Sequence, residues 1–111
     1  MATTPEGKVK KRVTDILTLL GAYYFFPMTG GYGTSGVPDI VGCWQGLFFG
    51  IECKAEGNQP TALQQMQLSR IGQHNGTAFV VNEATATYEY IYEQLNKGRS
   101  RLQERLRVED Q

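Results

Sequence analysis

The chain has 111 residues, a length typical of one compact domain, so we expect no second domain. It is 41% hydrophobic and 20% charged, which excludes a wholly disordered chain. Its 11 basic and 11 acidic residues balance, so the net charge does not indicate a polyanionic partner. An apolar run long enough to span a membrane and a signal-peptide pattern are both missing from the sequence, so we expect an intracellular protein that is not secreted.

The first third of the chain predicts a helix, a strand and a loop. Hydrophobic residues recur at helical spacing from Glu6 to Leu20, and Gly21 is expected to end this helix. An aromatic run over residues 22–27 is typical of a strand. The glycine-rich residues 28–36 predict a loop that lets another backbone come close.

The middle of the chain predicts two strands, a helix and a third strand. The strands cover residues 38–44 and 47–54, and the helix begins after Thr61 and stops near residue 75. A short buried strand covers residues 77–81.

The last part of the chain is ambiguous. Residues 83–96 alternate partly like a strand but fit a helix better, and we predict a helix. We expect one domain over residues 1–98 and a charged tail over residues 99–111, which either extends the helix or is disordered. The order helix, three strands, helix, strand, helix predicts an α/β sandwich around one mixed sheet.

The two strands in the middle of the chain carry two acidic residues, Asp39 and Glu52, among hydrophobic ones. If Gln45 and Gly46 form a two-residue loop, Asp39 stands six residues before it and Glu52 six residues after it. The two acids are then cross-strand neighbours with Cβ atoms about 4.5–5.5 Å apart, where like charges are destabilising. Lys54 shares the face of Glu52, and the large hydrophobic residues point to the other face.

Two interpretations of the paired acids are open. Mg²⁺ binds carboxylate oxygens and keeps positions for water and phosphate, so the pair could form a metal site. Alternatively, Lys54 and cations of the first helix neutralise the pair in a surface salt-bridge cluster.

Strand alternation and helix position also assign four other residues. Cys43 and Cys53 fall on opposite faces, which excludes a disulfide between them, and we expect both to be small buried residues. Trp44 is expected in the core rather than in a base-stacking site. His74 is expected to cap the second helix rather than act as a general base.

The motifs around the two acids resemble those of a nuclease family. Pro38-Asp39 followed by Glu52-Cys53-Lys54 is similar to the PD-(D/E)XK nuclease motif. The segments GVPDIVG, GLFFGIECK and QPTALQ, followed by a helix, NG and AFVV, resemble the VRR-NUC family of virus-type replication and repair nucleases. The resemblance implies a restriction-endonuclease-like α/β/α sandwich.

The resemblance also implies roles for single residues. Asp39, Glu52 and the backbone carbonyl of Cys53 correspond to ligands of Mg²⁺ or Mn²⁺. Lys54 corresponds to the lysine that orients or deprotonates the attacking water and stabilises charge on the phosphate. Two further residues, Glu6 on the first helix and Gln64 on the second, correspond to residues that border the site, and Glu6 could also bind the metal.

Three of these residues have structural explanations as well. Thr61 and Gln64 have the spacing of a capping box, so Gln64 could serve the helix, the site or both. Glu6 could only complement the positive end of the first helix. Lys54 could be only a salt-bridge partner.

We therefore expect a metal-dependent DNA endonuclease that is selective for Holliday junctions or other branched DNA in replication, recombination or repair. The alternatives are a sequence-specific restriction-type endonuclease and a non-catalytic nucleic-acid-binding module with the same fold. Phosphate contacts are expected from the basic first helix, the glycine-rich loop and the tail, which favours recognition by shape. The first two segments supply the candidate residues Lys8, Lys11, Arg12, Gly33, Thr34 and Ser35.

The resemblance also implies a homodimer, because two symmetric active sites suit a symmetric four-way junction. Tyr23, Tyr24 and Tyr32 are candidates for the dimer face, with the core as the alternative for the first two. The family is compatible with a phage source, which would place the protein in the cytoplasm of a bacterial host.

Overall fold

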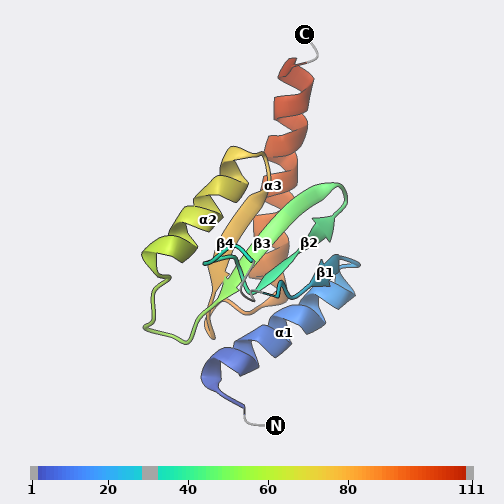
Figure 1. Ribbon diagram of the computed structural model, residues 1–111. Helices are drawn as coiled ribbons and strands as arrows, with labels where there is room; N and C mark the ends of the chain where they lie inside the picture. The colour runs from blue at the N-terminus through green and yellow to red at the C-terminus, as the bar shows by residue number, and fades with distance from the viewer. Residues whose placement is uncertain (1–2, 29–32, 110–111) are drawn as a thin grey trace.

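A computed structural model describes residues 3–28 and 33–109, in which helices and strands follow the predicted order (Figure 1). The elements are α1 (Pro5–Leu19), β1 (Tyr23–Phe25), β2 (Ile40–Trp44), β3 (Leu47–Cys53), α2 (Ala62–Gln73), β4 (Thr77–Val81) and α3 (Tyr88–Glu109). Within these described ranges, the helices are too short or too polar to cross a membrane.

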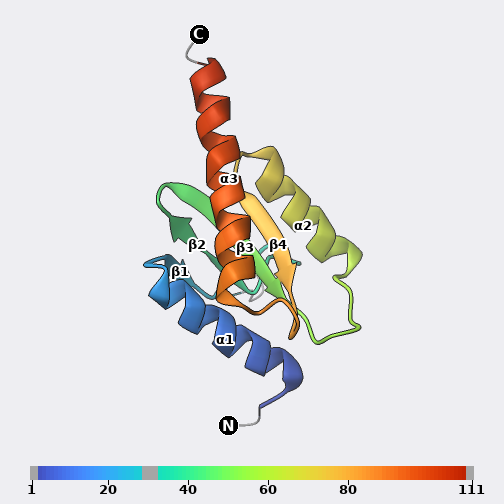
Figure 2. The ribbon, with the colours of Figure 1, turned by 180° about the vertical axis from the view of Figure 1, so that it is seen from behind.

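The strands form one sheet in the order β1-β2-β3-β4. The β1–β2 and β2–β3 pairs are antiparallel and the β3–β4 pair is parallel, so the predicted mixed sheet is confirmed. Figures 1 and 2 show α2 on one face of the sheet and α3, with α1, on the other. The molecule is therefore an α/β/α sandwich, as predicted.

The β2–β3 hairpin has the predicted turn and register. Gln45 and Gly46 have φ angles of 49° and 86°, the left-handed conformation that a two-residue type I′ turn requires. Ile40 pairs with Ile51, so the next position outward sets Asp39 opposite Glu52. The hydrophobic face is buried in the core at Ile40, Trp44, Leu47, Phe49, Ile51 and Cys53.

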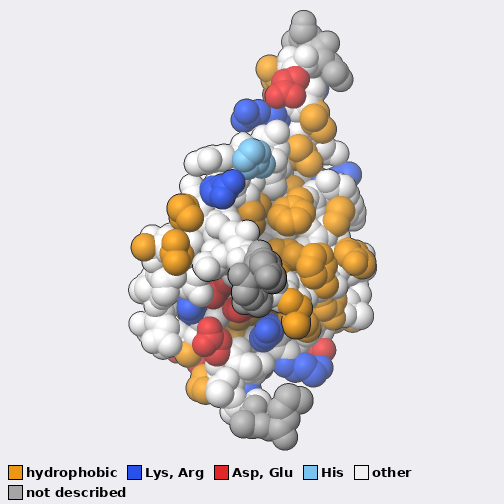
Figure 3. All heavy atoms as spheres, viewed as in Figure 1, with side chains coloured by type: hydrophobic (Ala, Val, Ile, Leu, Met, Phe, Trp, Pro, Cys, Tyr) orange, Lys and Arg blue, Asp and Glu red, His pale blue; other side chains and the backbone are white. Residues whose placement is uncertain are grey.

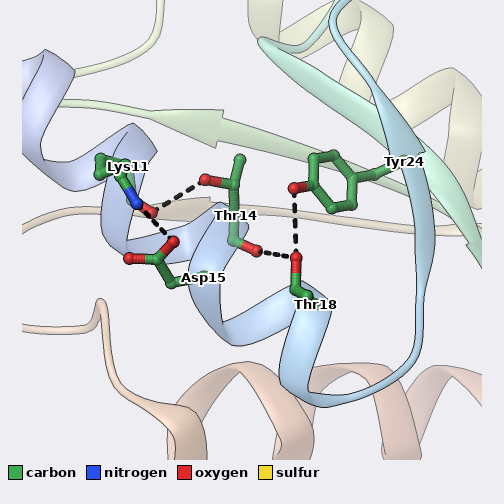
Figure 4. A network of polar contacts seen from close by, with 5 residues as sticks. All are labelled: Lys11, Thr14, Asp15, Thr18 and Tyr24. Atoms are coloured by element: carbon green, nitrogen blue, oxygen red, sulfur yellow. Dashed lines mark hydrogen bonds and ion pairs between the residues drawn. The ribbon is translucent and has the colours of Figure 1, made fainter.

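Helix α1 covers one end of this core. The Thr4 hydroxyl oxygen accepts a hydrogen bond from the Gly7 N–H (2.9 Å), and Gly21 follows the helix at a φ of +75°. Val9, Val13, Ile16 and Leu17 are its buried hydrophobic residues. Figure 4 shows how the last turn is tied to β1, since the Thr18 hydroxyl donates to the Thr14 carbonyl and lies 3.3 Å from the Tyr24 hydroxyl.

Helix α3 begins later than predicted. Residues 82–87 form a turn in which the Asn82 side chain accepts hydrogen bonds from the backbone N–H groups of Ala84 (2.9 Å) and Thr85 (3.2 Å). The predicted start at residue 83 is therefore wrong, because these local side-chain bonds compete with the helix. Beyond Gly98 the helix continues to Glu109 and extends away from the sheet (Figure 1).

The cysteine prediction is half correct. Cys53 is buried in the core, but Cys43 is exposed, and both thiols are free. Cys43 lies near the β1 edge, on the face that α2 covers only partly, so alternation alone did not settle its burial. Trp44 is buried, and its indole N–H donates to the Leu20 carbonyl at 3.1 Å, which confirms its place in the core.

Gly50 lies on the acidic face of β3, and the space beside it is filled. A Cβ atom at this position would lie 2.8 Å from Ile71 Cδ1 and 2.9 Å from Pro38 Cγ. Glycine therefore lets α2 and the loop before β2 approach the sheet directly. The missing side chain therefore leaves no open space beside the acids.

We expect Gly50→Ala to lower the free energy of unfolding by about 1–3 kcal/mol, because the added methyl group must displace Ile71 or Pro38. Urea unfolding measures this change. Gly72→Ala is the matched control, since a Cβ at Gly72 meets nothing within 4 Å and alanine favours a helix by up to about 1 kcal/mol. Equal stabilities of the two variants would contradict the packing described here.

Candidate active site

Three carboxylates converge at one end of the sheet. Glu6 lies in the first turn of α1, Asp39 directly precedes β2, and Glu52 lies near the end of β3. One oxygen of each lies within 4.8 Å of the others. The pairing of Asp39 with Glu52 follows from the hairpin, and the packing of α1 against the sheet adds Glu6.

Asp39 is held in place by the backbone of the opposite strand. Its Oδ2 atom accepts a hydrogen bond from the Cys53 N–H at 2.9 Å. A residue in a strand presents its N–H and its C=O to the same neighbouring strand, so the Cys53 carbonyl also faces the side of Asp39. The Lys54 N–H instead donates to the Val81 carbonyl of β4 at 2.9 Å.

Glu52 is the most unusual of the three acids. It is only 1% exposed, and in the described part of the chain its Oε1 atom has no hydrogen-bond partner. Burial raises the pKa of Glu52 to about 7, the nearby charge of Asp39 adds to the rise, and Lys54 partly opposes it. A carboxylate in this position is costly to the fold unless a positive charge compensates it.

Lys54 supplies part of that compensation. Its Nζ atom lies 3.5 Å from Glu52 Oε2, and its side chain is 13% exposed. The ammonium pairs with one oxygen of Glu52 and leaves Oε1 without a partner. Neutralisation by Lys54 therefore accounts for only part of the acidic cluster.

A small cavity opens beside the cluster. It has a volume of about 330 Å³, and its lining consists of Thr4, Glu6, Gly7, Lys10 and Asp39. The Lys10 ammonium also lies over the Phe26 ring, 4.5 Å from its centroid. Lys10 belongs to the basic cluster near the start of the chain but was not among the predicted phosphate contacts, although it stands four residues after Glu6 and so shares its side of the helix.

The predicted nucleic-acid contacts are all exposed, and Lys8 and Arg12 on α1 face away from the acids. Lys8 and Arg12 line a different cavity with Glu83 and Ala86, and their positions on α1 are about half a turn from Glu6. The Lys11 ammonium pairs with Asp15 at 2.6 Å (Figure 4). The loop candidates Gly33, Thr34 and Ser35 are also exposed.

Gln64 has the structural role that its spacing indicated. Its Oε1 atom accepts from the Thr61 N–H (2.9 Å), and the Thr61 hydroxyl oxygen accepts from the Gln64 N–H (3.2 Å), which completes a capping box. Among the described residues, the Gln64 side chain makes no hydrogen bond to the acidic cluster. A role in the site stays a prediction.

His74 lies at the C-terminal cap of α2, as predicted. Its backbone N–H bonds to the Arg70 carbonyl at 3.2 Å, and Asn75 follows with a φ of 71°.

The donor set suits a hard divalent cation. Mg²⁺ and Mn²⁺ prefer carboxylate and carbonyl oxygens, and the cluster offers three carboxylates with the Cys53 carbonyl on the same side. The partnerless Oε1 atom of Glu52 is the observation that favours a ligand over a closed salt-bridge cluster.

Comparison with known proteins identifies the fold class. A solved structure described as a VRR_NUC domain matches with a TM-score of 0.63 and 23% sequence identity, over 81% of this chain and 92% of the other. Searches of family models and of curated proteins gave no match. The chain therefore has the fold of a VRR-NUC domain, and the fold predicted from its motifs is confirmed.

The raised pKa of Glu52 predicts a pH-dependent stability. An ordinary glutamate ionises near pH 4.5, whereas folded Glu52 keeps its proton up to about pH 7, so metal-free protein loses stability between these values as the pH rises. We expect Glu52→Gln to unfold like wild type at pH 4, but to be more stable at pH 8 by up to about 3 kcal/mol. Urea unfolding in EDTA measures this difference.

Glu93→Gln is the matched control, because Glu93 is an exposed partner of Lys97 on α3. It should unfold with the pH dependence of wild type. The interpretation of Glu52 is wrong if Glu52→Gln also unfolds with that same pH dependence.

Proposed function

We propose that the protein is a metal-dependent DNA endonuclease of the VRR-NUC family, with a PD-(D/E)XK active site. The main support is the convergence of Glu6, Asp39 and Glu52 within 4.8 Å, next to the Lys54 ammonium. The shared fold with a solved VRR_NUC domain adds to this support. Oxygen ligands for a divalent cation beside a positively charged side chain suit the metal-assisted hydrolysis of a phosphodiester.

Asp39 and Glu52 would hold Mg²⁺ or Mn²⁺, with the Cys53 carbonyl as a further ligand and Glu6 binding directly or through water. When bound, the cation would lower the pKa of a bound water molecule and neutralise charge on the phosphate.

The side chains around the carboxylates have separate tasks in this proposal. The Lys54 ammonium is largely shielded from solvent, so its charge would act strongly on a phosphate oxygen and on the attacking water. The Cys53 N–H holds one Asp39 oxygen and leaves the other free to bind. Lys10 lines the same cavity and would contact a phosphate oxygen next to the cleaved bond.

For the substrate, we propose branched DNA, including Holliday junctions, in replication, recombination or repair. The exposed candidates on α1 and in the glycine-rich loop would contact the sugar–phosphate backbone, which carries shape rather than sequence information. A binding module without catalysis is a poorer explanation, because carboxylates beside a phosphate would repel it in the absence of a cation.

We expect Asp39→Asn and Lys54→Ala each to reduce Mg²⁺-dependent or Mn²⁺-dependent DNA cleavage by at least about 100-fold, because each removes a ligand or a charge at the reacting phosphate. Glu6→Gln should have a smaller effect if Glu6 acts through water. Initial rates on a four-way junction, a flap and a plain duplex measure these changes.

Lys97→Ala is the control for charge, since Lys97 pairs with Glu93 on the surface of α3 and should keep wild-type activity. If the wild-type protein cleaves none of the three DNAs with Mg²⁺ or Mn²⁺, the proposed nuclease activity is refuted. Cutting at a fixed sequence in linear duplex would identify a restriction-type endonuclease instead.

We also propose a homodimer that uses the β1 edge of the sheet. β1 pairs only with β2 among the described strands, and Tyr23 and Phe25 are 69% and 49% exposed. Hydrophobic side chains gather on this side of the molecule (Figure 3). Tyr24 is half-buried and packs against the core, and Tyr32 lies outside the described residues.

We expect Phe25→Lys to dissociate this dimer, because charged residues on an edge strand oppose pairing with a second sheet. Sedimentation velocity across the micromolar range measures the change, and Leu106→Lys, an equally exposed position on α3, is the control. A wild-type protein that sediments as a monomer throughout that range would contradict the dimer.

A further inference from the structure

A third cavity lies on the face of the sheet that α2 covers. It has a volume of about 380 Å³, and its lining consists of Thr34, Val37, Phe48, Gln67, Arg70, Ile71, His74 and Gly76. We call it the α2 groove. It is separate from the acidic cavity, because the two linings share no residue.

The α2 groove combines an exposed aromatic ring with groups that bind anions. Phe48 projects from β3 and is 49% exposed. Gln67 and Arg70 line the groove from α2 and His74 lines it from the C-terminal cap of that helix, and none of the described lining residues is a carboxylate. In the described part of the chain, the Arg70 side chain forms no ion pair and no hydrogen bond, so its guanidinium is available to a ligand.

The charge distribution separates the α2 groove from the acidic cluster. Figure 3 shows basic and histidine side chains over the end of α2, and acidic side chains further down the same face. A negatively charged ligand would therefore be attracted to the groove even without a metal ion.

The α2 groove lies close to the acidic cluster, where the proposed cleavage would take place. Phe48 and Glu52 lie on the same face of β3, four residues apart, which corresponds to about 13 Å along the strand. Ile71 and Pro38 pack over Gly50 between them. A nucleic-acid strand in the groove would thus reach the acidic cluster within a few nucleotides.

We propose that the α2 groove binds an unpaired nucleotide of the DNA strand that flanks the cleaved bond. Its base stacks on the Phe48 ring, and its phosphate is bound by Arg70 and His74. Gln67 can exchange hydrogen bonds with the edge of the base. That this nucleotide flanks a cleaved bond rests on the proposed function, whereas binding of the nucleotide in the groove does not require cleavage.

This arrangement would favour branched DNA over plain duplex. Inside a duplex the faces of the bases are covered by their neighbours, so stacking on a ring such as Phe48 first requires a base to be unstacked, which costs free energy. Flaps and open junctions supply such a base without the cost of unstacking.

Binding measured in EDTA tests the α2 groove without cleavage. Fluorescence anisotropy gives the affinity of wild type, Phe48→Ala and Arg70→Gln for a plain duplex and for the same duplex with a single-stranded flap. The base analogue 2-aminopurine, placed at successive flap positions, reports which base stacks on the ring.

We expect Phe48→Ala to weaken flap binding about 10-fold, within the range measured for base–aromatic stacking, and to change duplex binding less than about twofold. On binding, the fluorescence of 2-aminopurine should change most at one flap position, and this change should be lost in Phe48→Ala. Arg70→Gln should weaken flap binding and reduce its salt dependence by the contribution of about one phosphate.

Two variants outside the α2 groove are the controls. Tyr88 is 45% exposed on α3, on the other side of the sheet, so Tyr88→Ala should bind the flap like wild type. Lys97→Gln removes one positive charge, as Arg70→Gln does, but from a surface ion pair with Glu93 on α3, and it should also bind like wild type. Circular dichroism melting verifies that each variant is folded.

The inference is overturned if Phe48→Ala binds the flap like wild type, or if it loses flap and duplex binding equally. A Phe48→Ala variant that changes only the sedimentation coefficient would assign the ring to self-association instead. The nuclease proposal can fail separately. If the protein binds the flap through Phe48 but cleaves no DNA, the proposed nucleotide site in the α2 groove stands and the proposed nuclease activity is refuted.

Discussion

The register of the β2–β3 hairpin is the constraint on which the rest of the structure depends. Gln45 and Gly46 both adopt positive φ, and this turn matches the natural twist of the two strands. A slip of one residue would exchange the two faces, so Glu52 would enter the core and Ile51 would leave it. The same register therefore supplies the hydrophobic face for α1 and α3 and the acidic face for the candidate site.

The burial of Glu52 shows a cost to the fold that the candidate site explains. An apolar residue of similar size would be expected to suit this position better, because Oε1 has no partner among the described residues and the pKa of the side chain is raised. The neighbouring core residues Phe49, Ile51 and Cys53 are fully or almost fully buried and can offset this cost. Such local conflicts are expected where a fold carries a function.

Prediction from the sequence succeeded where short-range rules decide the structure. The hairpin register, the capping box at Thr61 and the strand at Thr77–Val81 follow from turn residues, spacing and alternation within a few positions. It failed at two places for different reasons. At Asn82, local side-chain hydrogen bonds form a turn that delays the start of α3. Cys43 is exposed because α2 contacts β3 and β4 and does not cover the whole face.

The sequence by itself determined which residues of the hairpin face each other, because alternation and a two-residue turn leave a single pairing of Asp39 with Glu52. Only the tertiary structure decided that Glu52 is buried and that Lys10 rather than Lys8 lines the acidic cavity. It also decided that Phe48 and Arg70 line the same groove. These features depend on how α1 and α2 pack against the sheet. Such packing joins residues far apart in the chain, and local periodicity carries no information about it.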